Sequence, residues 1–419
     1  MALYDDLSPE KAVCYVRECT SLFGNGEEIT AHEISFEEGE GYVNHLYKIT
    51  GSSGKTVILK QAKPYFRFLG SGDALPHVAV ERSRIEADTY RIREVIIPQY
   101  LLKLLHIDHE NNLFIQEYCD FSSMRSQLRE GLEFPFFPSM IGEYIAKSAF
   151  YTSELFLDQS EHHELSARFV NSGMRRIMEE LIFEFATLGS EDDVREFLKT
   201  HYDFQPALLK DKEFLIELLS MRDVYMKKGE CLVHGDLHTS NILISQKQLY
   251  VFDMEYTHMG AYTGDIGYLC GNLVYAFVAG HFNKQKNMTE RQTFCHHIIS
   301  YISELVDVFE RQFRECWKAD AKPLYRDNPE YMDVLFRNFI PEISGFIGLQ
   351  TLLRVLHHPG IQDFDDIKSD DDIEQARTLC VIIGVSLLKH RQKMQSIRQV
   401  VDLIEGSARD FFMSLRQAA

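Results

Sequence analysis

Hydrophobic residues recur with two different periods along the chain, and the change of period divides it into two parts. Over residues 29–61 apolar and polar positions alternate, with a glycine-rich turn in the middle and a second turn at Gly51-Ser52-Ser53-Gly54. Alternation is typical of half-buried strands, so we predict a three-stranded antiparallel meander. A helix over 1–23 is expected to precede it, because Ser8-Pro9-Glu10 is a helix-start signal.

Beyond Gly131 the pattern becomes mainly helical. Before that point, Leu113–Cys119 is an apolar run that is expected to form a buried strand and then a linker. The expected helices span about 138–160, 172–186, 192–200, 210–228, 264–279, 289–319, 329–357 and 371–416. The acidic segment Asp363–Asp372 is interpreted as a solvated surface loop.

Two short apolar runs interrupt the helical series at 231–256. The first leads into Asp236 and Asn241, and the second leads into Asp253 and Glu255. Phosphoryl transfer from ATP needs one carboxylate facing the acceptor hydroxyl and further oxygen ligands for Mg²⁺. We therefore interpret Asp236 as the residue that orients the nucleophile and accepts its proton. Asn241, Asp253 and Glu255 are interpreted as ligands of the metal.

The spacing His-x-Asp-x₄-Asn, from His234 to Asn241, also matches the catalytic loop of protein-kinase-like folds. A capped loop between two strands is the purely structural alternative. Asp265 follows at the start of an apolar helix, where we expect it to brace this loop and not to react.

The N-terminal part carries features that a nucleotide site would use. Gly39 and Gly41 lie in the first turn of the meander, where a backbone without side chains can approach phosphates, and Asn44 follows them. An ordinary hairpin turn is the alternative for these glycines. The backbone of Glu117 and Cys119, at the predicted linker, is where we expect an adenine to hydrogen-bond.

Lys60 ends the third apolar strand, and burying a lysine is unfavourable unless a partner meets its charge. The next helical segment, 81–90, offers two acids. Glu86 lies near its middle, where a kinase-like fold places the acid that pairs with this lysine, and Glu81 is the competitor.

The composition of the chain argues against some classes of partner. The 63 acidic residues outnumber the 44 lysines and arginines, and the formal charge is −19, which argues against nucleic-acid or anionic-membrane partners. The 8 cysteines are scattered without a Cys-x₂-Cys pair, so we expect a reduced, cytoplasmic protein. The longest apolar runs are about half of what a membrane span needs. A small-molecule or nucleotide substrate fits best.

These features occur in the order found in small-molecule kinases. The chain resembles the aminoglycoside-phosphotransferase and choline-kinase-like group, and within it the 5-methylthioribose kinase family, through nearly its whole length. The segments that carry the resemblance are Val57–Arg67, Phe150–Glu154, Ala167–Asn171, His234–Thr239, Gly260–Gly267 and Gly271–Leu273.

The resemblance implies an α+β, bilobal protein-kinase-like fold. The small N-terminal ATP-binding lobe, an antiparallel sheet plus a helix, would span 1–119, and the large, mainly helical catalytic and substrate-binding lobe would span 120–419. It also implies transfer of the ATP γ-phosphate to the 1-hydroxyl of 5-methylthioribose, a step of methionine salvage, by an enzyme that is usually a homodimer.

The resemblance gives individual residues their roles. Asp236 would be the catalytic base, and Lys60 would hold the α- and β-phosphates. Asp253 and Glu255 would form an Asp-x-Glu metal site. Gly39 and Gly41 would lie over the phosphates.

Three departures from the family bear on the acceptor and the metal. Ala74-Leu75-Pro76 stands where the family has a tryptophan before a proline, and the sole tryptophan is Trp317. Leu353-Arg354 stands where the family has an Arg-Arg pair, so Arg354 is the candidate acceptor-binding residue. Asn241 replaces a usual serine. The first two departures keep open a kinase for another pentose, a deoxypentose or an aminoglycoside.

A nucleotide-binding pseudokinase scaffold is the alternative from another class. Such proteins usually lack the strand lysine, the base or a metal ligand. Lys60, Asp236, Asn241, Asp253 and Glu255 are all present, which favours an enzyme.

Overall fold

The described residues of the computed structural model are 4, 7–34, 43–65, 67, 78–183, 208, 210–283, 286–356 and 361–418. Contacts along the chain divide it into two units. Unit 1 comprises Met1–Phe121, Asn171–Arg175 and Tyr250–Thr257, and unit 2 comprises Ser122–Val170, Arg176–Leu249 and His258–Ala419. Unit 1 thus includes two segments from later in the sequence. The boundary predicted between residues 119 and 120 stays a prediction.

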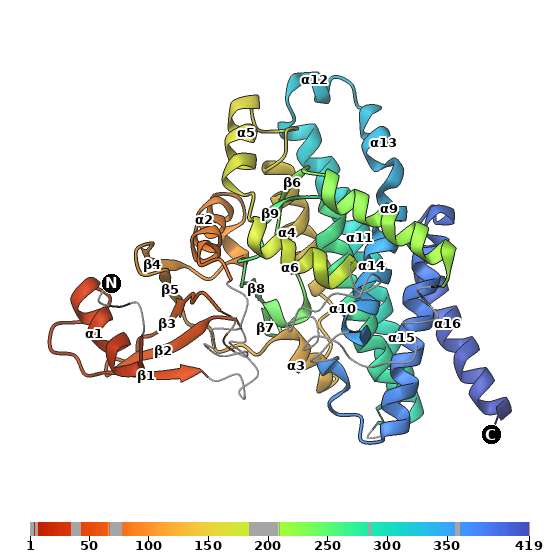
Figure 1. Cartoon of the computed structure of the whole chain (residues 1–419), viewed down its shortest axis with the longest axis horizontal. Helices are drawn as coiled ribbons and strands as arrows, with labels where there is room; N and C mark the ends of the chain where they lie inside the picture. Colours follow the sequence, from red (N-terminus) through yellow and green to blue (C-terminus); the bar gives the residue numbers. More distant parts are fainter. Residues whose placement is uncertain are drawn as a thin grey trace. The chain divides into compact units, whose positions relative to one another are not determined.

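Unit 1 is built on a five-stranded antiparallel sheet in the order β1-β2-β3-β5-β4 (Figure 1). Its strands are β1 (Ile29–Ile34), β2 (His45–Gly51), β3 (Thr56–Gln61), β4 (Leu104–Asp108) and β5 (Leu113–Glu117). The first three strands are the predicted meander, with neighbouring strands antiparallel. The central position of β3 fixes Lys60 opposite Leu46 on one side and Phe114 on the other.

The two faces of this sheet have different partners, because side chains alternate along a strand. Tyr47, Ile49 and Leu59 pack with residues of α1 (Pro9–Cys19) in one apolar core. Lys60, one residue after Leu59, therefore points to the opposite face. Helix α2 (Glu81–Ile96) contacts β4 and β5, and η3 (Pro98–Tyr100) follows it.

Unit 2 is mainly helical. Its helices are α3 (Met124–Arg129), α4 (Phe137–Tyr151), α5 (Gln159–Arg168), α6 (Ser172–Phe183, whose first residues belong to unit 1), α9 (Lys212–Lys227), α10 (Tyr262–Phe282), α11 (Met288–Asp320), α12 (Pro323–Arg326), α13 (Tyr331–Leu335), α14 (Phe339–Leu356), α15 (Asp370–His390) and α16 (Ile397–Ala418). Short 3₁₀ turns are η5 (Thr239–Asn241), η6 (Phe336–Asn338), η7 (Gln362–Phe364) and η8 (Arg391–Lys393). Strands β6 (Cys231–Val233) and β9 (His258–Gly260) pair, and β7 (Ile242–Ile244) pairs with β8 (Leu249–Val251, whose last two residues belong to unit 1).

Helix α10 is the core of unit 2, and nearly all of its residues are buried. It packs most closely on α14, where Gly267 and Gly271 let the two backbones approach. A Cβ atom on Gly267 would lie 2.2 Å from Cβ of Phe346, and one on Gly271 would lie 2.6 Å from Cβ of Gln350. The position of Arg354, in the last turn of α14, therefore depends on this glycine contact.

Four predicted helices were wrong in extent. The helix predicted over 1–23 is α1 (Pro9–Cys19), which the side chain of Ser8 caps. The 138–160 helix ends at Tyr151, because Asp158 begins α5 with a capping box. The 371–416 helix is two helices, and the side chain of Ser396 accepts the N–H of Gln399 at the start of α16. The 329–357 helix is α13, η6 and α14, with Pro341 in the first turn of α14. The predicted helix 192–200 lies outside the described residues.

The acidic segment Asp363–Asp372 is only partly a surface loop. Asp363 is 4 % exposed, in η7, and pairs with Arg125. Asp370, Asp371 and Asp372 form the first turn of α15, where carboxylates interact favourably with the helix dipole. The interpretation as a solvated loop was therefore wrong for both ends of the segment.

Candidate active site

Lys60 is the centre of a buried charge cluster in unit 1. Its Nζ lies 2.7 Å from Glu86 Oε2 and also contacts Asp253. Glu81 is exposed, so the geometry assigns the pair to Glu86. Burial opposes the charge of Lys60, but the carboxylates of Asp253 and Glu86 outweigh it and raise its pKa. The lysine is thus held protonated.

Glu86, Asp253 and Glu255 each offer an oxygen, and these three oxygens lie within 4.8 Å of one another. Among the described residues, Lys60 and Arg82 form ion pairs with them. Three carboxylates against two cations leave a net negative charge, which burial makes unfavourable unless a further cation or proton compensates it. Consistent with this, burial raises the pKa of both Glu86 and Glu255. The cluster fits a divalent cation.

Glu255 is held on one side by two residues of unit 1. Its Oε2 accepts hydrogen bonds from Asn44 Nδ2 at 2.7 Å and lies 3.2 Å from Arg82 Nε. Asn44 in turn accepts from Arg82 Nε at 3.1 Å. Asn44 therefore orients the predicted metal-binding acid. Asp253 is more accessible, with a side chain 32 % exposed, and has φ of 63°, a left-handed backbone that is unusual for a non-glycine residue.

Arg82 was missed by the sequence reasoning. It is fully buried, and one turn of α2 separates it from Glu86. Residues four apart share a helix face, so an arginine four positions before the predicted acid was the signal that could have found it.

Some of the other residues that were predicted to bind the nucleotide lie outside the described part of unit 1. Gly39 and Gly41 lie outside the described residues, as does Ala74-Leu75-Pro76. The N–H of Glu117 already donates to the carbonyl of Lys103 at 2.9 Å. The carbonyl of Glu117 and the backbone of Cys119 are therefore the better candidates for adenine.

The predicted catalytic loop belongs to unit 2 and begins where β6 ends. Asp265, in the first turn of α10, accepts the N–H of His234 at 2.7 Å and the N–H of Gly235 at 3.0 Å. The amide of Asn241 donates from Nδ2 to the carbonyl of Asp236 at 3.0 Å, which leaves its Oδ1 as an acceptor. Asp265 thus braces the loop, as the sequence predicted.

Asp236 is held ionised. Burial alone would raise its pKa, but the charges of His238, Arg354 and His234 outweigh burial and lower it to about 2. His238 Nε2 lies 3.4 Å from Asp236 Oδ2, and its Nδ1 accepts the N–H of Ser240 at 3.2 Å. Because Nδ1 is an acceptor, Nε2 carries the proton that faces Asp236.

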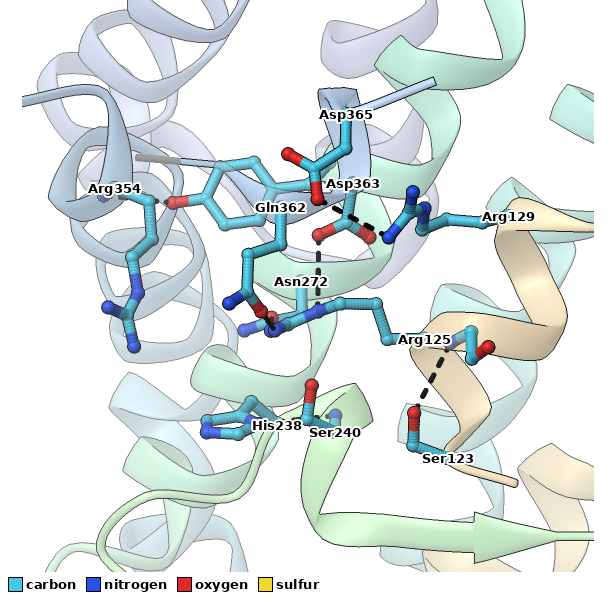
Figure 2. Close-up of polar contacts among 12 residues, drawn as sticks. Ser123, Arg125, Arg129, His238, Ser240, Asn272, Arg354, Gln362, Asp363 and Asp365 are labelled. Carbon is cyan, nitrogen blue, oxygen red and sulfur yellow. Dashed lines mark hydrogen bonds and ion pairs between the residues drawn. The ribbon is translucent and has the colours of Figure 1, made fainter. Parts of the chain in front are cut away.

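Arg354 projects from the end of α14 near this loop (Figure 2). Its backbone N–H donates to the hydroxyl of Tyr275 at 3.2 Å. The preceding Leu353 is buried in the core of unit 2. Of the two residues that replace the Arg-Arg pair, Arg354 is therefore the one that bears on Asp236.

The predicted residues thus form two groups. Unit 1 brings together Asn44, Lys60, Glu86, Asp253 and Glu255. Unit 2 brings together Asp236, Asn241 and Arg354. The first group has the charges of a metal–triphosphate site, and the second has an ionised carboxylate of the kind that orients a hydroxyl.

Comparison with known proteins agrees with this chemistry. Residues 174–291 match the model of the phosphotransferase enzyme family. A methylthioribose kinase from Geobacillus sp. (strain WCH70) is 28 % identical over 411 residues, covering 96 % of each chain. One from Bacillus cereus (strain AH187) is 26 % identical over 398 residues, covering 94 % of this chain and 95 % of that one. A choline kinase structure from Cryptosporidium parvum Iowa II has a TM-score of 0.51 at 12 % identity, covering 94 % of this chain and 99 % of that one.

The fold is therefore α+β and protein-kinase-like, as predicted. The chain is an ATP-dependent phosphotransferase. Within that class, it is similar over almost its full length to methylthioribose kinases that are 26–28 % identical to it. In the described part of the chain, no helix is long and apolar enough to cross a membrane.

Proposed function

We propose that the protein transfers the γ-phosphate of ATP to the 1-hydroxyl of 5-methylthioribose, in methionine salvage. The observation that carries the chemistry is Asp236, a partly exposed carboxylate held ionised on a loop that Asp265 braces. The acceptor is proposed from the methylthioribose kinases that match nearly the whole chain.

Asp236 orients the acceptor hydroxyl and receives its proton as the new P–O bond forms and the bond to ADP breaks. Its low pKa means that it is ionised at neutral pH, so no proton has to leave it before the acceptor binds. Orientation of the hydroxyl is accordingly its main contribution.

The residues of unit 1 bind the nucleotide. Lys60, kept protonated and positioned by Glu86, binds the α- and β-phosphates. Gly39 and Gly41 are proposed to lie over the phosphates, and the backbone at Glu117 and Cys119 to bind adenine.

Asp253 and Glu255, with Asn241, are proposed to hold Mg²⁺. The excess of carboxylates over cations in the Lys60 cluster supports this assignment. The metal would neutralise charge on the β- and γ-phosphates. We further propose, from the family resemblance, a cytoplasmic homodimer.

Release of ADP tests the acceptor. The purified protein, ATP and Mg²⁺ are assayed with 5-methylthioribose, ribose, 2-deoxyribose and kanamycin. We expect kcat/KM to be highest with methylthioribose by at least tenfold. A higher kcat/KM with another acceptor would replace methylthioribose, and no ADP release with any acceptor would contradict the sugar-kinase function itself.

A further inference from the structure

Arg125 is a largely buried cation that no part of the predicted site included. It lies in α3, whose first turn is capped by the hydroxyl of Ser123 through the N–H of Ser126 at 3.3 Å. Its side chain is 13 % exposed. No nearby sequence pattern marks it, because all of its partners are more than 140 residues away.

Three acceptors from α10 and η7 hold the guanidinium group (Figure 2). Nε lies 3.3 Å from Asp363 Oδ2, Nη2 donates to Asn272 Oδ1 at 3.2 Å, and Nη1 donates to Gln362 Oε1. A guanidinium has five N–H donors. Each Nη atom therefore keeps a second N–H that these bonds do not use.

The fixed guanidinium lies within electrostatic range of the predicted catalytic residues. Burial lowers the pKa of the Arg125 guanidinium. The positive charge of Arg354 also lowers this pKa, and the negative charge of Asp236 raises it. The positive charge of Arg354 in turn lowers the pKa of Asp236. In Figure 2 the guanidinium groups of Arg125 and Arg354 both extend toward His238, the neighbour of Asp236. Arg125, Arg354 and Asp236 thus surround one region of unit 2.

The charges of this region select an acceptor class. Two guanidinium groups offer donors to hydroxyl or ring oxygens, and they repel an ammonium group. Asp363 pairs with Arg125, and the positive charge of Arg354 acts on Asp236, so each of these two carboxylates already has a guanidinium neighbour and is a poor partner for a cationic acceptor.

We propose that Arg125 is a specificity-determining residue, which binds an oxygen of the sugar acceptor together with Arg354 and excludes amine-bearing acceptors. Asp363 is its positioning residue, because it contacts the guanidinium at Nε. The inference rests on the proposed function and names the acceptor class of that same site: neutral polyhydroxyl sugars.

The first test separates acceptor binding from folding. R125Q should raise KM for methylthioribose by about 10- to 100-fold, the effect of one lost hydrogen bond to a charged group, with KM for ATP changed less than twofold. D363N should raise the same KM by a smaller factor. R129Q is the matched control, because Arg129 also joins α3 to the η7 region, through Asp365 and Asp366, but does so at the surface. It should leave KM for methylthioribose unchanged.

The second test addresses charge selectivity. Ribose and 2-amino-2-deoxyribose, which differ by one cationic group, are compared as competitive inhibitors against methylthioribose. Wild type should bind ribose at least tenfold more tightly than the amine, and R125Q should reduce this ratio severalfold. R125K should keep the ratio, because it keeps the charge, while still raising KM for methylthioribose.

These outcomes distinguish the inference from the proposed function. If wild type phosphorylates methylthioribose but R125Q has an unchanged KM and an unchanged inhibitor ratio, the role of Arg125 is wrong and the kinase function stands. An equal increase in KM with R129Q would show that Arg125 acts only by tethering α3. If wild type phosphorylates no sugar, the proposed function fails first.

Discussion

Asp265 accepts the backbone N–H of Gly235 at 3.0 Å, at a residue whose φ of 82° is left-handed. The same carboxylate accepts the N–H of His234, so one buried acid of α10 fixes the backbone immediately before Asp236. Glycine adopts this conformation without the steric penalty of a Cβ atom. The orientation of Asp236 therefore depends on a carboxylate that takes no part in the reaction.

The variant D265A should lower kcat by about 100-fold, because a misplaced catalytic group can reduce the rate by that factor. Loss of two buried hydrogen bonds should also destabilise the protein by about 2–4 kcal/mol. The matched control is T263V, which removes a buried hydrogen bond to Glu342 from the same helix turn. Steady-state kinetics measure kcat of both variants, and urea unfolding measures their free energy of unfolding. Equal losses of kcat in the two variants would show that helix stability, and not the loop, sets the rate.

Asp236 itself is tested by D236N, which keeps the shape of the side chain and removes its charge. We expect kcat to fall by about 100- to 10,000-fold, the range typical of a lost general base, while ATP affinity changes less than threefold. Turnover is followed by ADP release, and ATP affinity by calorimetry. A variant with near wild-type turnover would exclude Asp236 as the base.

The contact between Lys60 and Glu86 predicts that substitutions of the two residues have non-additive effects on the free energy of unfolding. K60M should destabilise the protein by about 3–5 kcal/mol and abolish measurable ATP binding, because it leaves Glu86 buried without its cation. The double variant K60M/E86Q has one uncompensated charge fewer than K60M, so stability should recover by at least about 1 kcal/mol relative to K60M. Urea unfolding of the four proteins gives the coupling energy. Additive effects of the two substitutions would contradict a direct charge pair.

The pKa of His281 predicts how the free energy of unfolding changes with pH. Burial, aided by the charge of Arg291, lowers its pKa from 6.5 to about 4. The unfolded chain therefore binds a proton at higher pH than the folded one, and stability is lost as pH falls from about 6.5 toward 4. Between pH 7 and pH 5 the free energy of unfolding should fall by about 1–2 kcal/mol more in wild type than in H281Q. Urea unfolding at both pH values measures this, with H163Q, at an exposed histidine, as the control. Identical losses in wild type and H281Q would show that other groups carry the pH dependence.

The elements and site residues that were predicted well from the sequence are those marked by a pattern within a short stretch of the chain. The meander followed from alternation, and the order of Lys60, Glu86, Asp236 and Asp253 followed from motif spacing. Helix breaks were missed at Asp158 and Ser396, although both are caps with an acid or amide three residues later.

The rest depends on contacts between distant segments. The pair of Arg125 and Asp363 joins residues 238 positions apart in sequence, and neither has a neighbouring pattern that indicates burial. An acidic run normally indicates solvent. Only the fold shows that Asp363 is buried beside an arginine, and for this reason the acceptor side of the site was less predictable than the nucleotide side.

The central claim, that this chain phosphorylates the 1-hydroxyl of 5-methylthioribose, is tested most directly by identifying the product. The protein is incubated with ATP, Mg²⁺ and methylthioribose labelled with ¹³C at C1, and the mixture is followed by ³¹P and ¹³C NMR. We predict one new phosphate ester whose phosphorus couples to C1, formed in a 1:1 ratio with ADP. A phosphate on any other carbon, or ADP formed without a labelled ester, would contradict the claim.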